Sequence, residues 1–264
     1  LGREFKDKVR VIGVGTTGSG RYMIARLFGA DVVKDEITAQ ARAAITLDPL
    51  VDTVFEIGGQ DSKFISLRNG VVTDFQMNKI CAAGTGSFIE EQSKKFDIPI
   101  DDFGDKALAS TKPEYLGERC TVFIETSIAA CLANGTSTED IVSGLCYSIV
   151  KNYLNRVVGQ KKIGDRIFLQ GGIAYNQGVI NAFRSLTGKE IIVPPFFSVT
   201  GAYGAAILTC EEMGSRKTSF KGFDHIASSG EGEIEKVANS DSGSDFEEMV
   251  TDLIFEGYDG TRGF

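Results

Sequence analysis

The sequence predicts an α/β fold, and three observations about its strands and turns support this class. An apolar run at residues 51–57 has the character of a buried strand and ends directly on two glycines. Two strand-like runs at residues 64–67 and 71–75 follow, joined through an Asn-Gly pair that favours the type I′ turn of a β-hairpin. A later strand, residues 166–170, again ends on two glycines. A strand, a glycine turn and an antiparallel hairpin in this order suggest the first three strands of a ribonuclease-H-like lobe.

The first glycine-rich segment follows a strand-like run at residues 9–12. Residues 13–20 formally match the G-x-G-x-x-G pattern of dinucleotide-binding folds and precede a helical run at residues 21–28. The acidic residues that follow come too early for the usual spacing of about 20 residues. We therefore favour a tight strand-to-helix connection capped by Thr17 or Ser19. An anion or a partner bound at this helix N-terminus stays open as an alternative.

Helices are predicted where apolar residues recur at helical spacing. The expected ranges are residues 35–46, 87–96, 120–132, 138–158 and 177–186, with a last helix from residue 201 onward. Residues 99–103 are expected to close the second of these helices, and residues 190–193 to form a strand. The run at 138–158 has an apolar face spaced by four: Ile141, Leu145, Ile149, Tyr153 and Val157. Small residues would let the last helix cross another helix at close range: Gly201, Gly204 and Ala205.

Length and composition describe an ordinary globular chain. It has 264 residues, 42% hydrophobic and 24% charged, which suffices for one large domain or two lobes that share a core. No apolar run approaches the roughly 20 residues needed to cross a bilayer, so no membrane contact is expected. The net charge of −8 argues against a nucleic-acid partner. Five unevenly spaced cysteines fit a reducing cytosol better than a disulfide framework, and we expect a cytoplasmic protein.

The stretch from residue 56 to residue 88 holds the most informative chemistry. A Gly-Gly pair at residues 58–59 follows a strand, and Gly84 and Gly86 precede a helix. Glycine turns let backbone N–H groups approach an anion closely, because no Cβ intervenes. Cys81 stands just before the second turn. On the residues alone, a plain turn remains an alternative for the first site, and a small core residue remains one for the cysteine.

Five short patterns occur along the chain in one order: Gly-Gly-Gln-Asp at 58–61, Cys-Ala-Ala-Gly-Thr-Gly at 81–86, Cys-Thr-Val-Phe-x-Glu at 120–125, Gly-Gly-x-x-x-Asn at 171–176 and Thr-Gly-Ala-x-Gly-Ala at 200–205. In this order they closely resemble the activator components of 2-hydroxyacyl-CoA dehydratases and the ATPase subunits of benzoyl-CoA reductases. The resemblance covers about residues 9–212. It implies an actin-like ATPase fold of the sugar kinase, actin and heat-shock superfamily, with ribonuclease-H-like lobes of which the first is truncated.

The resemblance implies a site for ATP or ADP with Mg²⁺. Four positions match the second phosphate loop: Gly58, Gly59, Gln60 and Asp61. Three match the adenosine turn: Gly171, Gly172 and Asn176. Three more lie where a loop facing the cleft would sense the phosphates: Gly84, Thr85 and Gly86. Glu56, where relatives usually have Asp, and Asp61 are the expected catalytic residues, in contact with Mg²⁺-bound water. Glu125 is expected either to hydrogen-bond the nucleotide or to cap a neighbour.

The resemblance also implies a [4Fe–4S] cluster shared by the two subunits of a homodimer, each offering Cys81 and Cys120. The residues agree, because four thiolates suit such a cluster and two per chain require a symmetric partner. Each cysteine precedes a helix, whose N-terminal partial charge would stabilise a thiolate. Zinc is disfavoured, since there is no C-x-x-C pair and His225 is the only histidine. The other cysteines sit in apolar helical patterns and are expected in the core: Cys131, Cys146 and Cys210.

The implied function is that of an ATP-dependent one-electron donor. Its partner would be a 2-hydroxyacyl-CoA dehydratase or a benzoyl-CoA-reductase-type protein, with a low-potential electron donor upstream. Two alternatives stay open: a small-molecule kinase of the same superfamily, with inert cysteines, and a non-catalytic regulatory module of a larger activator. The family opens with an Asp-x-Gly-Ser-Thr phosphate loop that has no match here. We therefore expect a fragment that binds ATP weakly by itself.

The acidity of the chain lies at its end. Residues 222–264 hold eleven Asp and Glu against one Lys and one Arg, a balance of −9, so the rest of the chain sums to +1. This end is also rich in Gly and Ser, as linkers are. We expect three parts: residues 1–48 as the remnant of a first lobe, residues 49–214 as the nucleotide-binding lobe with the cluster cysteines and a return helix, and residues 215–264 as an acidic linker or tail.

Overall fold

The structure is a computed structural model that describes residues 9–78, 84–118 and 121–228. The chain forms two compact units, one of residues 40–200 and one that joins residues 1–39 to residues 201–264. One boundary between these units falls inside the helix Glu36–Leu47, and the other falls at the start of the helix Thr200–Met213. The division expected from the sequence, at residues 48 and 214, concerns the lobes of a larger fold and stays a prediction.

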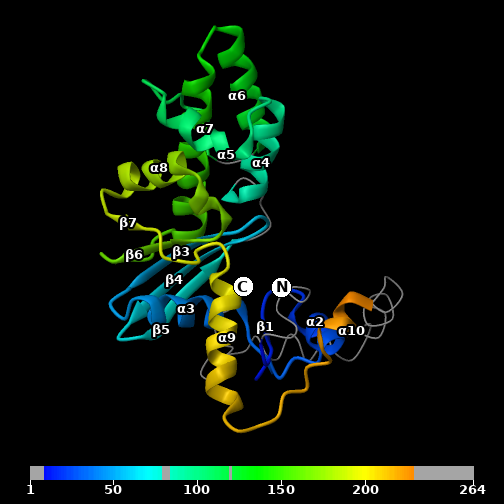
Figure 1. Cartoon of the computed structure of the whole chain (residues 1–264). Helices are drawn as coiled ribbons and strands as arrows, with labels where there is room; N and C mark the ends of the chain where they lie inside the picture. Colours follow the sequence, from blue (N-terminus) through cyan, green and yellow to red (C-terminus); the bar gives the residue numbers. More distant parts are fainter. Residues whose placement is uncertain (1–8, 79–83, 119–120, 229–264) are drawn as a thin grey trace, which may run out of the picture. The chain divides into compact units, whose positions relative to one another are not determined.

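The larger unit is built on a five-stranded sheet in the order β5-β4-β3-β6-β7 (Figure 1). Its strands are β3 (Thr53–Ile57), β4 (Ser62–Arg68), β5 (Val71–Met77), β6 (Ile167–Gln170) and β7 (Ile191–Ile192). The central strand β3 is antiparallel to β4 and parallel to β6, and β4 continues antiparallel to β5. The α/β class is confirmed, and the central strand with its hairpin has the arrangement expected for a ribonuclease-H-like lobe.

The β4–β5 hairpin turns where the sequence indicates. Asn69 and Gly70 have φ values of 52° and 73°, both in the left-handed region. A type I′ turn requires positive φ at both central residues, which Asn and Gly tolerate best. The predicted hairpin is therefore confirmed.

One face of the sheet is covered by α7 (Thr138–Tyr153) and α8 (Gln177–Thr187), and α5 (Ile100–Leu108) packs on these two helices (Figure 1). Ser137 caps α7, because its side chain accepts a hydrogen bond from Asp140 N. A π-helical turn, η2 (Leu154–Val158), continues this helix to the end of the predicted range. The predicted apolar face is buried throughout, which confirms it: Ile141, Leu145, Ile149, Tyr153 and Val157.

Helix α5 is absent from the sequence-based prediction, which ends the preceding helix near Pro99. Pro99 instead occupies the N-cap of α5, and Phe103 on this helix is fully buried. Gly104 lies in the middle of the helix, and because glycine has a low helix propensity the sequence there does not indicate a helix. A Cβ on Gly104 would lie only 2.8 Å from the backbone nitrogen of Gln177, so the close packing of α5 on α8 requires the glycine.

The remaining helices of the larger unit are α4 (Gly86–Lys95), α6 (Thr121–Ala133) and the short 3₁₀ helix η3 (Gly172–Tyr175). Helix α3 (Glu36–Leu47) begins in the smaller unit and ends in the larger one. Thr38 N donates to Asp35 Oδ1 at 2.9 Å, which caps its first turn.

The smaller unit contains β1 (Gly15–Thr16), parallel to β2 (Val32–Val33), with α2 (Arg21–Phe28), α9 (Thr200–Met213) and α10 (Phe223–Ser228). The predicted strand at residues 9–12 is wrong, since the strand begins only at Gly15. A Cβ on Gly15 would overlap the Thr209 hydroxyl on α9, so this glycine serves packing. The predicted close approach of α9 is confirmed, because a Cβ on Gly204 would overlap the Ala39 carbonyl on α3.

The N-terminus of α2 also differs from the prediction. Gly20 is its N-cap residue, and no side chain caps it. Ser19 Oγ instead donates to Glu36 Oε1 at 3.4 Å. Capping by Thr17 or Ser19 is therefore wrong. Across the described ranges, no helix has the length and apolar character that crossing a bilayer requires.

Candidate functional site

Two glycine turns meet at one edge of the central sheet. Strands β3 and β6 run parallel and in register, with Glu56 opposite Gln170. The carboxyl ends of adjacent parallel strands share an edge, so the turns that follow them are neighbours. Gly171 has a φ of 89°, and a Cβ there would overlap the carbonyl of Ile57. Only glycine suits this conformation and this close approach.

A cleft of about 860 Å³ opens at these turns. Five of the residues predicted to bind nucleotide line it: Gly58, Gly59, Gly86, Gly172 and Asn176. Ile173 and Tyr175 of η3 also line it. The opposite wall comes from α4, the start of α5 and the connection between them, where Ile89, Ile98 and Ile100 are apolar and Lys94, Asp97 and Asp101 are charged. This size and this mixture of apolar walls with a few polar groups are typical of small-molecule sites.

The orientation of the Asn176 amide is set by its neighbours. Asn176 Oδ1 accepts a hydrogen bond from Val179 N at 3.1 Å as the N-cap of α8, and Cys146 Sγ donates to the same oxygen at 3.8 Å. The amide nitrogen therefore points away from the helix. Nδ2 is buried and has no hydrogen-bond partner in the part of the chain that the structure describes. A ligand atom that accepts a hydrogen bond would satisfy it.

Helix α4 is anchored on the first glycine turn. Gly86 N donates to Gly58 O at 2.8 Å, and Ser87 N donates to Gly59 O at 2.9 Å. The Ser87 hydroxyl donates to the same Gly59 carbonyl. These contacts satisfy N–H groups of a helix start that lacks a side-chain cap. The turn and the helix therefore form one hydrogen-bonded unit.

Several predicted site residues lie behind the cleft wall. Thr85 is fully buried, and a Cβ on Gly84 would lie 2.7 Å from Asn152 Oδ1, so both face the interior of the protein. Gly171 is buried beneath the second turn. Gln60 is exposed at the tip of the first turn. Of the 84–86 segment, only Gly86 reaches the cleft.

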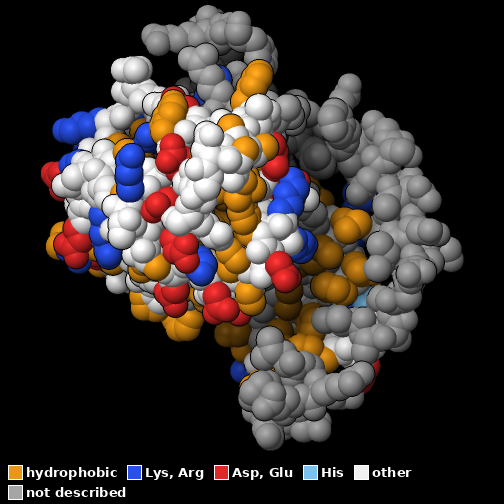
Figure 2. All heavy atoms as spheres, turned by 90° about the horizontal axis from the view of Figure 1, so that it is seen from above, with side chains coloured by type: hydrophobic (Ala, Val, Ile, Leu, Met, Phe, Trp, Pro, Cys, Tyr) orange, Lys and Arg blue, Asp and Glu red, His pale blue; other side chains and the backbone are white. Residues whose placement is uncertain are grey.

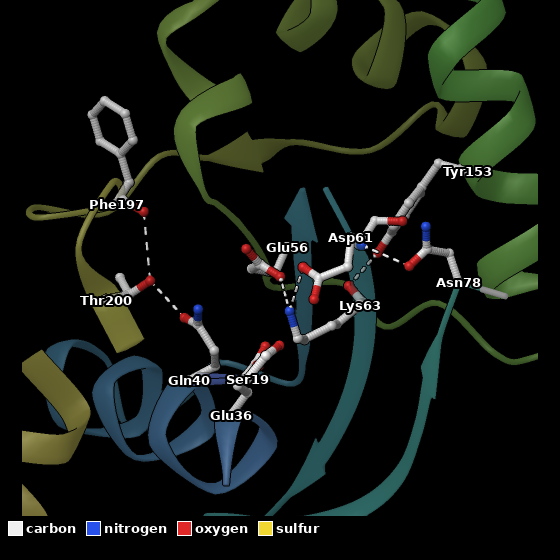
Figure 3. A network of polar contacts seen from close by, with 11 residues as sticks. Ser19, Glu36, Gln40, Glu56, Asp61, Lys63, Asn78, Tyr153, Phe197 and Thr200 are labelled. Atoms are coloured by element: carbon white, nitrogen blue, oxygen red, sulfur yellow. Dashed lines mark hydrogen bonds and ion pairs between the residues drawn. The ribbon is translucent and has the colours of Figure 1, made fainter. Parts of the chain in front are cut away.

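Three charged side chains form a cluster beside the two turns (Figure 3). The Lys63 ammonium on β4 lies 3.0 Å from Glu56 Oε2 and 2.7 Å from Asp61 Oδ1. Lys63 and Glu56 are 2% and 5% exposed, whereas the Asp61 side chain is 35% exposed. Because an unpaired buried charge is costly, the three groups depend on one another as an ion-paired unit. We call it the Glu56–Lys63–Asp61 cluster.

Tyr153 connects this cluster with helix α7. Its hydroxyl donates to the backbone carbonyl of Lys63 at 2.8 Å. Burial raises the pKa of the Tyr153 phenol well above its usual range, and the negative charge of Glu56 raises it further. The phenol is therefore neutral at neutral pH and acts as a hydrogen-bond donor.

Lys63 is the member of the cluster that sequence reasoning missed. A signal for it exists, because a lysine directly before the apolar residues Phe64 and Ile65 must find a counter-charge when the strand extends over it and is buried. Its partners follow from strand register: Glu56 and Lys63 are directly opposite in the antiparallel β3–β4 pair. The length of the turn between the two strands decides that register.

Glu125 lies on α6 and contacts α4. Its Oε1 accepts hydrogen bonds from Lys95 Nζ at 2.7 Å and from Gln92 Nε2 at 2.5 Å. Burial works against ionisation, but these two hydrogen bonds prevail and lower the pKa of Glu125. Of the two roles expected for Glu125, contact with a neighbouring element is the one observed, and Glu125 does not line the cleft.

The predicted cluster ligands, Cys81 and Cys120, lie outside the described residues. Within the described ranges, no group of three or more His, Cys, Asp or Glu side chains is arranged to hold a metal ion. Cys146 is in the core as predicted, and burial raises the pKa of its thiol to about 12. Cys131 is half-buried against the core, whereas Cys210 is exposed, so its assignment to the core is wrong.

The face seen in Figure 2 carries both signs of charge. Lys and Arg side chains lie among Asp and Glu side chains, with hydrophobic side chains between them. Exposed ion pairs of this mixed kind occur on α4 at helical spacing, Lys94 with Glu90 and Lys95 with Glu91, both at 2.7 Å. Such interspersed charges create no extended field of one sign on this face.

Comparison with known proteins identifies relatives of this chain. A model of the BadF/BadG/BcrA/BcrD ATPase family matches residues 2–209. The (R)-2-hydroxyglutaryl-CoA dehydratase activating ATPase of Acidaminococcus fermentans is 36% identical over 194 residues, 72% of this chain and 72% of the relative. The 2-hydroxyisocaproyl-CoA dehydratase activator of Clostridioides difficile is 34% identical over 215 residues, 80% of this chain and 77% of the relative.

A solved structure extends the likeness to three dimensions. The activator of the 2-hydroxyisocaproyl-CoA dehydratase from Clostridium difficile, with bound ADPNP, matches with a TM-score of 0.70 at 33% identity. The match covers 76% of this chain and 74% of that one.

Proposed function

This chain belongs to the BadF/BadG/BcrA/BcrD ATPase family, and we propose that it is the ATP-binding and ATP-hydrolysing part of a 2-hydroxyacyl-CoA dehydratase activator. The resemblance inferred from the five sequence patterns is confirmed at the level of the family, and so is the actin-like α/β fold class. Two relatives are named as activators of acyl-CoA dehydratases. A dehydratase, or a reductase of the benzoyl-CoA type, is therefore the proposed partner.

The observation that carries the proposal is the cleft where the two glycine turns meet. We place the phosphates of ATP at the Gly58-Gly59 turn, where backbone can approach an anion without hindrance from a Cβ. The adenosine then lies toward Gly172 and Asn176, and the Asn176 amide nitrogen donates to an acceptor on the nucleoside. The bound ADPNP of the Clostridium difficile relative supports a nucleotide of this class.

Hydrolysis is assigned to the carboxylates beside the turn. Glu56 and Asp61 are proposed to accept hydrogen bonds from water bound to Mg²⁺, and an oxygen-only donor set suits a hydrated Mg²⁺. Asp61 is the more accessible of the two, and its backbone carbonyl accepts a hydrogen bond from Gly58 N at 2.9 Å. Asp61 and the Gly58-Gly59 turn therefore belong to one loop that a backbone hydrogen bond closes.

The proposal includes a [4Fe–4S] cluster held by Cys81 and Cys120 of each subunit in a homodimer. Such a cluster supplies one-electron transfer at low potential, here to the dehydratase or reductase and from an upstream donor. The described flank fits a thiolate ligand, because α6 begins at Thr121, directly after Cys120, and a helix N-terminus favours negative charge.

A continuous set of contacts supports coupling between the nucleotide and this helix. The Gly58-Gly59 turn is hydrogen-bonded to the start of α4, and α4 is hydrogen-bonded through Lys95 and Gln92 to Glu125 on α6. A turn that shifts between ATP-bound and ADP-bound states would therefore move α4 and, through Glu125, α6. Differential affinity of the two states for nucleotide would gate electron transfer.

Anaerobic purification of the protein that contains this chain tests the proposal. We expect ATP hydrolysis, a dimer by mass, and about two iron and two sulfide per subunit, as one shared four-iron cluster demands. The variants Cys81→Ser and Cys120→Ser should lose the iron–sulfur absorption, whereas Cys210→Ser, at an exposed cysteine, should keep it. Iron–sulfur absorption that survives both ligand substitutions would refute the cluster, and absence of ATPase activity would refute the proposed hydrolysis.

A further inference from the structure

We propose that Lys63 is the positioning residue of this hydrolysis site: its ammonium holds one oxygen of Glu56 and thereby directs the other oxygen toward the junction of the two glycine turns. The inference rests on the proposed function, because it assigns a role within ATP hydrolysis to a cluster that lies directly behind the turns lining the same cleft. Figure 3 shows the lysine between the two carboxylates.

The burial of Lys63 requires an explanation. The side chain is 2% exposed, and the other buried residues of β4 are Ser62, Phe64, Ile65 and Leu67. A buried ammonium destabilises a protein unless it is paired, and a hydrophobic side chain at the same position is often at least as stable. Two carboxylates surround this ammonium, at 3.0 Å and 2.7 Å. Stability alone therefore does not explain a lysine at this position. Fixing the orientation of the two carboxylates does explain it.

The two oxygens of Glu56 have different surroundings. Oε2 accepts the hydrogen bond from Lys63. Oε1 lies 3.4 Å from the position of a Cβ on Gly58 and 3.1 Å from that of a Cβ on Gly171. The second oxygen thus faces backbone from both turns that border the cleft. A carboxylate held at one oxygen by a fixed cation loses rotational freedom, and its other oxygen stays in this place.

The chemistry of hydrolysis gives this placement a use. A water oxygen bonds to the γ-phosphorus while the bond from phosphorus to the β,γ-bridging oxygen breaks, and ADP leaves with the electron pair. One proton of the water stays on the phosphate product and the other is released to solvent. Glu56 Oε1 orients the water by accepting a hydrogen bond, and Lys63 acts only through Glu56. Phosphoryl transfer depends mainly on such positioning.

The substitution Lys63→Met tests this role, since methionine keeps most of the side chain and removes the charge. We expect kcat for ATP hydrolysis to fall by about 100-fold, as a small misplacement of a catalytic group does, while KM for ATP stays within about threefold. Lys63→Arg keeps a cation between the carboxylates and should recover part of kcat. The matched control is Lys161→Met, which removes an ion pair with Asp74 at 2.6 Å outside the cleft and should leave kcat unchanged.

A double-mutant cycle separates positioning from a structural effect. If Lys63 acts through Glu56, adding Lys63→Met to Glu56→Gln should lower kcat no further, because residues that act as a unit are not additive. Independent, multiplicative losses would overturn the inference, and so would a Lys63→Met variant with unchanged kcat or with lost ATP affinity. A wild-type protein that does not hydrolyse ATP would instead refute the proposed function, so the two failures are distinguishable.

Discussion

The two faces of strands β3 and β4 carry opposite chemistry within adjacent residues. Phe55 and Phe64 face one side, with their ring centroids 6.1 Å apart, and the Phe55 ring lies 5.3 Å from Tyr153 and 5.2 Å from Phe183. The next residue along β3, Glu56, and the residue before Phe64 on β4, Lys63, are a cross-strand pair on the other side. Successive side chains of a strand point to opposite faces, so a single residue step separates the core from the charged cluster.

The aromatic residues and the charged residues are expected to contribute differently to stability and to catalysis. The aromatic face contributes through apolar burial, which is non-directional and large for each ring. The charged face contributes little net stability, because the desolvation of buried ions offsets their attraction. Substitutions of the stacked aromatic residues should therefore mainly lower stability, and substitutions within the Glu56–Lys63–Asp61 cluster should mainly lower the rate of hydrolysis.

Phe183→Ala should give the largest effect and tests the aromatic face. Phe183 is fully buried on α8 and stacks on Phe55, so truncation should lower the free energy of unfolding by about 3–5 kcal/mol. Urea denaturation followed by circular dichroism measures it. Phe123→Ala is the control, since Phe123 is 71% exposed and should change stability by about 0.5 kcal/mol at most. Similar losses for both variants would contradict the assignment of this face to the core.

Glu56→Gln comes next and tests the charged face. The substitution keeps the shape of the side chain and removes its charge, so kcat for ATP hydrolysis should fall on the order of 100-fold, about 2.7 kcal/mol in activation free energy. Lys63 keeps Asp61 as its counter-charge at 2.7 Å, so the loss of stability should be smaller than that of Phe183→Ala. Asp74→Asn, which breaks the exposed pair with Lys161, provides the matched carboxylate control. Equal rates for Glu56→Gln and wild type would remove Glu56 from the mechanism.

Tyr153→Phe should give the smallest effect. It tests whether the Tyr153 hydroxyl contributes to catalysis or only to stability. Its ring belongs to the aromatic side, while its hydroxyl donates to the carbonyl of Lys63. Loss of one hydrogen bond should lower the free energy of unfolding by about 1 kcal/mol. Steady-state kinetics should show kcat within about twofold of wild type, because the cluster itself keeps its contacts. A loss of kcat as large as that of Glu56→Gln would mean that the phenol shares the catalytic role.

Comparison of wild type with Tyr153→Phe also tests how stability depends on pH in the alkaline range. The pKa of Tyr153 is raised in the folded state, so its contribution is fully present below the unfolded value near 10 and is lost as pH rises beyond it. Wild-type stability should therefore decline more steeply above pH 10 than that of Tyr153→Phe. Parallel declines in denaturation midpoint between pH 9 and 11 would show that the phenol is not held neutral.

Much of the fold follows from local patterns, and the errors have local causes. The hairpin at Asn69-Gly70 and the apolar face of α7 are predictable, because turn chemistry and side-chain period act within a few residues. Helix α5 is not predicted, because Gly104 interrupts its helical pattern. The close packing of α5 on α8 requires this glycine. The strand at Gly15 is likewise set by contact with Thr209, which a local pattern does not contain.

Some features of the candidate site could be predicted from the sequence, and others could not. The glycine motifs that mark the two turns are visible in the sequence, and five of their residues line the cleft. Lys63, the anchoring of α4 on the first turn and the orientation of the Asn176 amide are not visible. Lys63 and α4 each depend on a partner from another element, Glu56 and Gly58. The Asn176 amide is oriented by Val179 of the helix that it caps and by Cys146 on α7.

Residue types and their spacing along the chain are enough to predict the family, the strand order around the hairpin and the motifs of the two turns. The contacts of the buried lysine with its two carboxylates, and the meeting of the turns at one cleft, are found only in the folded chain. They depend on strand register, because Glu56 is opposite Lys63 in one strand pair and opposite Gln170 in the other. A shift of one residue would turn these side chains to the opposite face of the sheet.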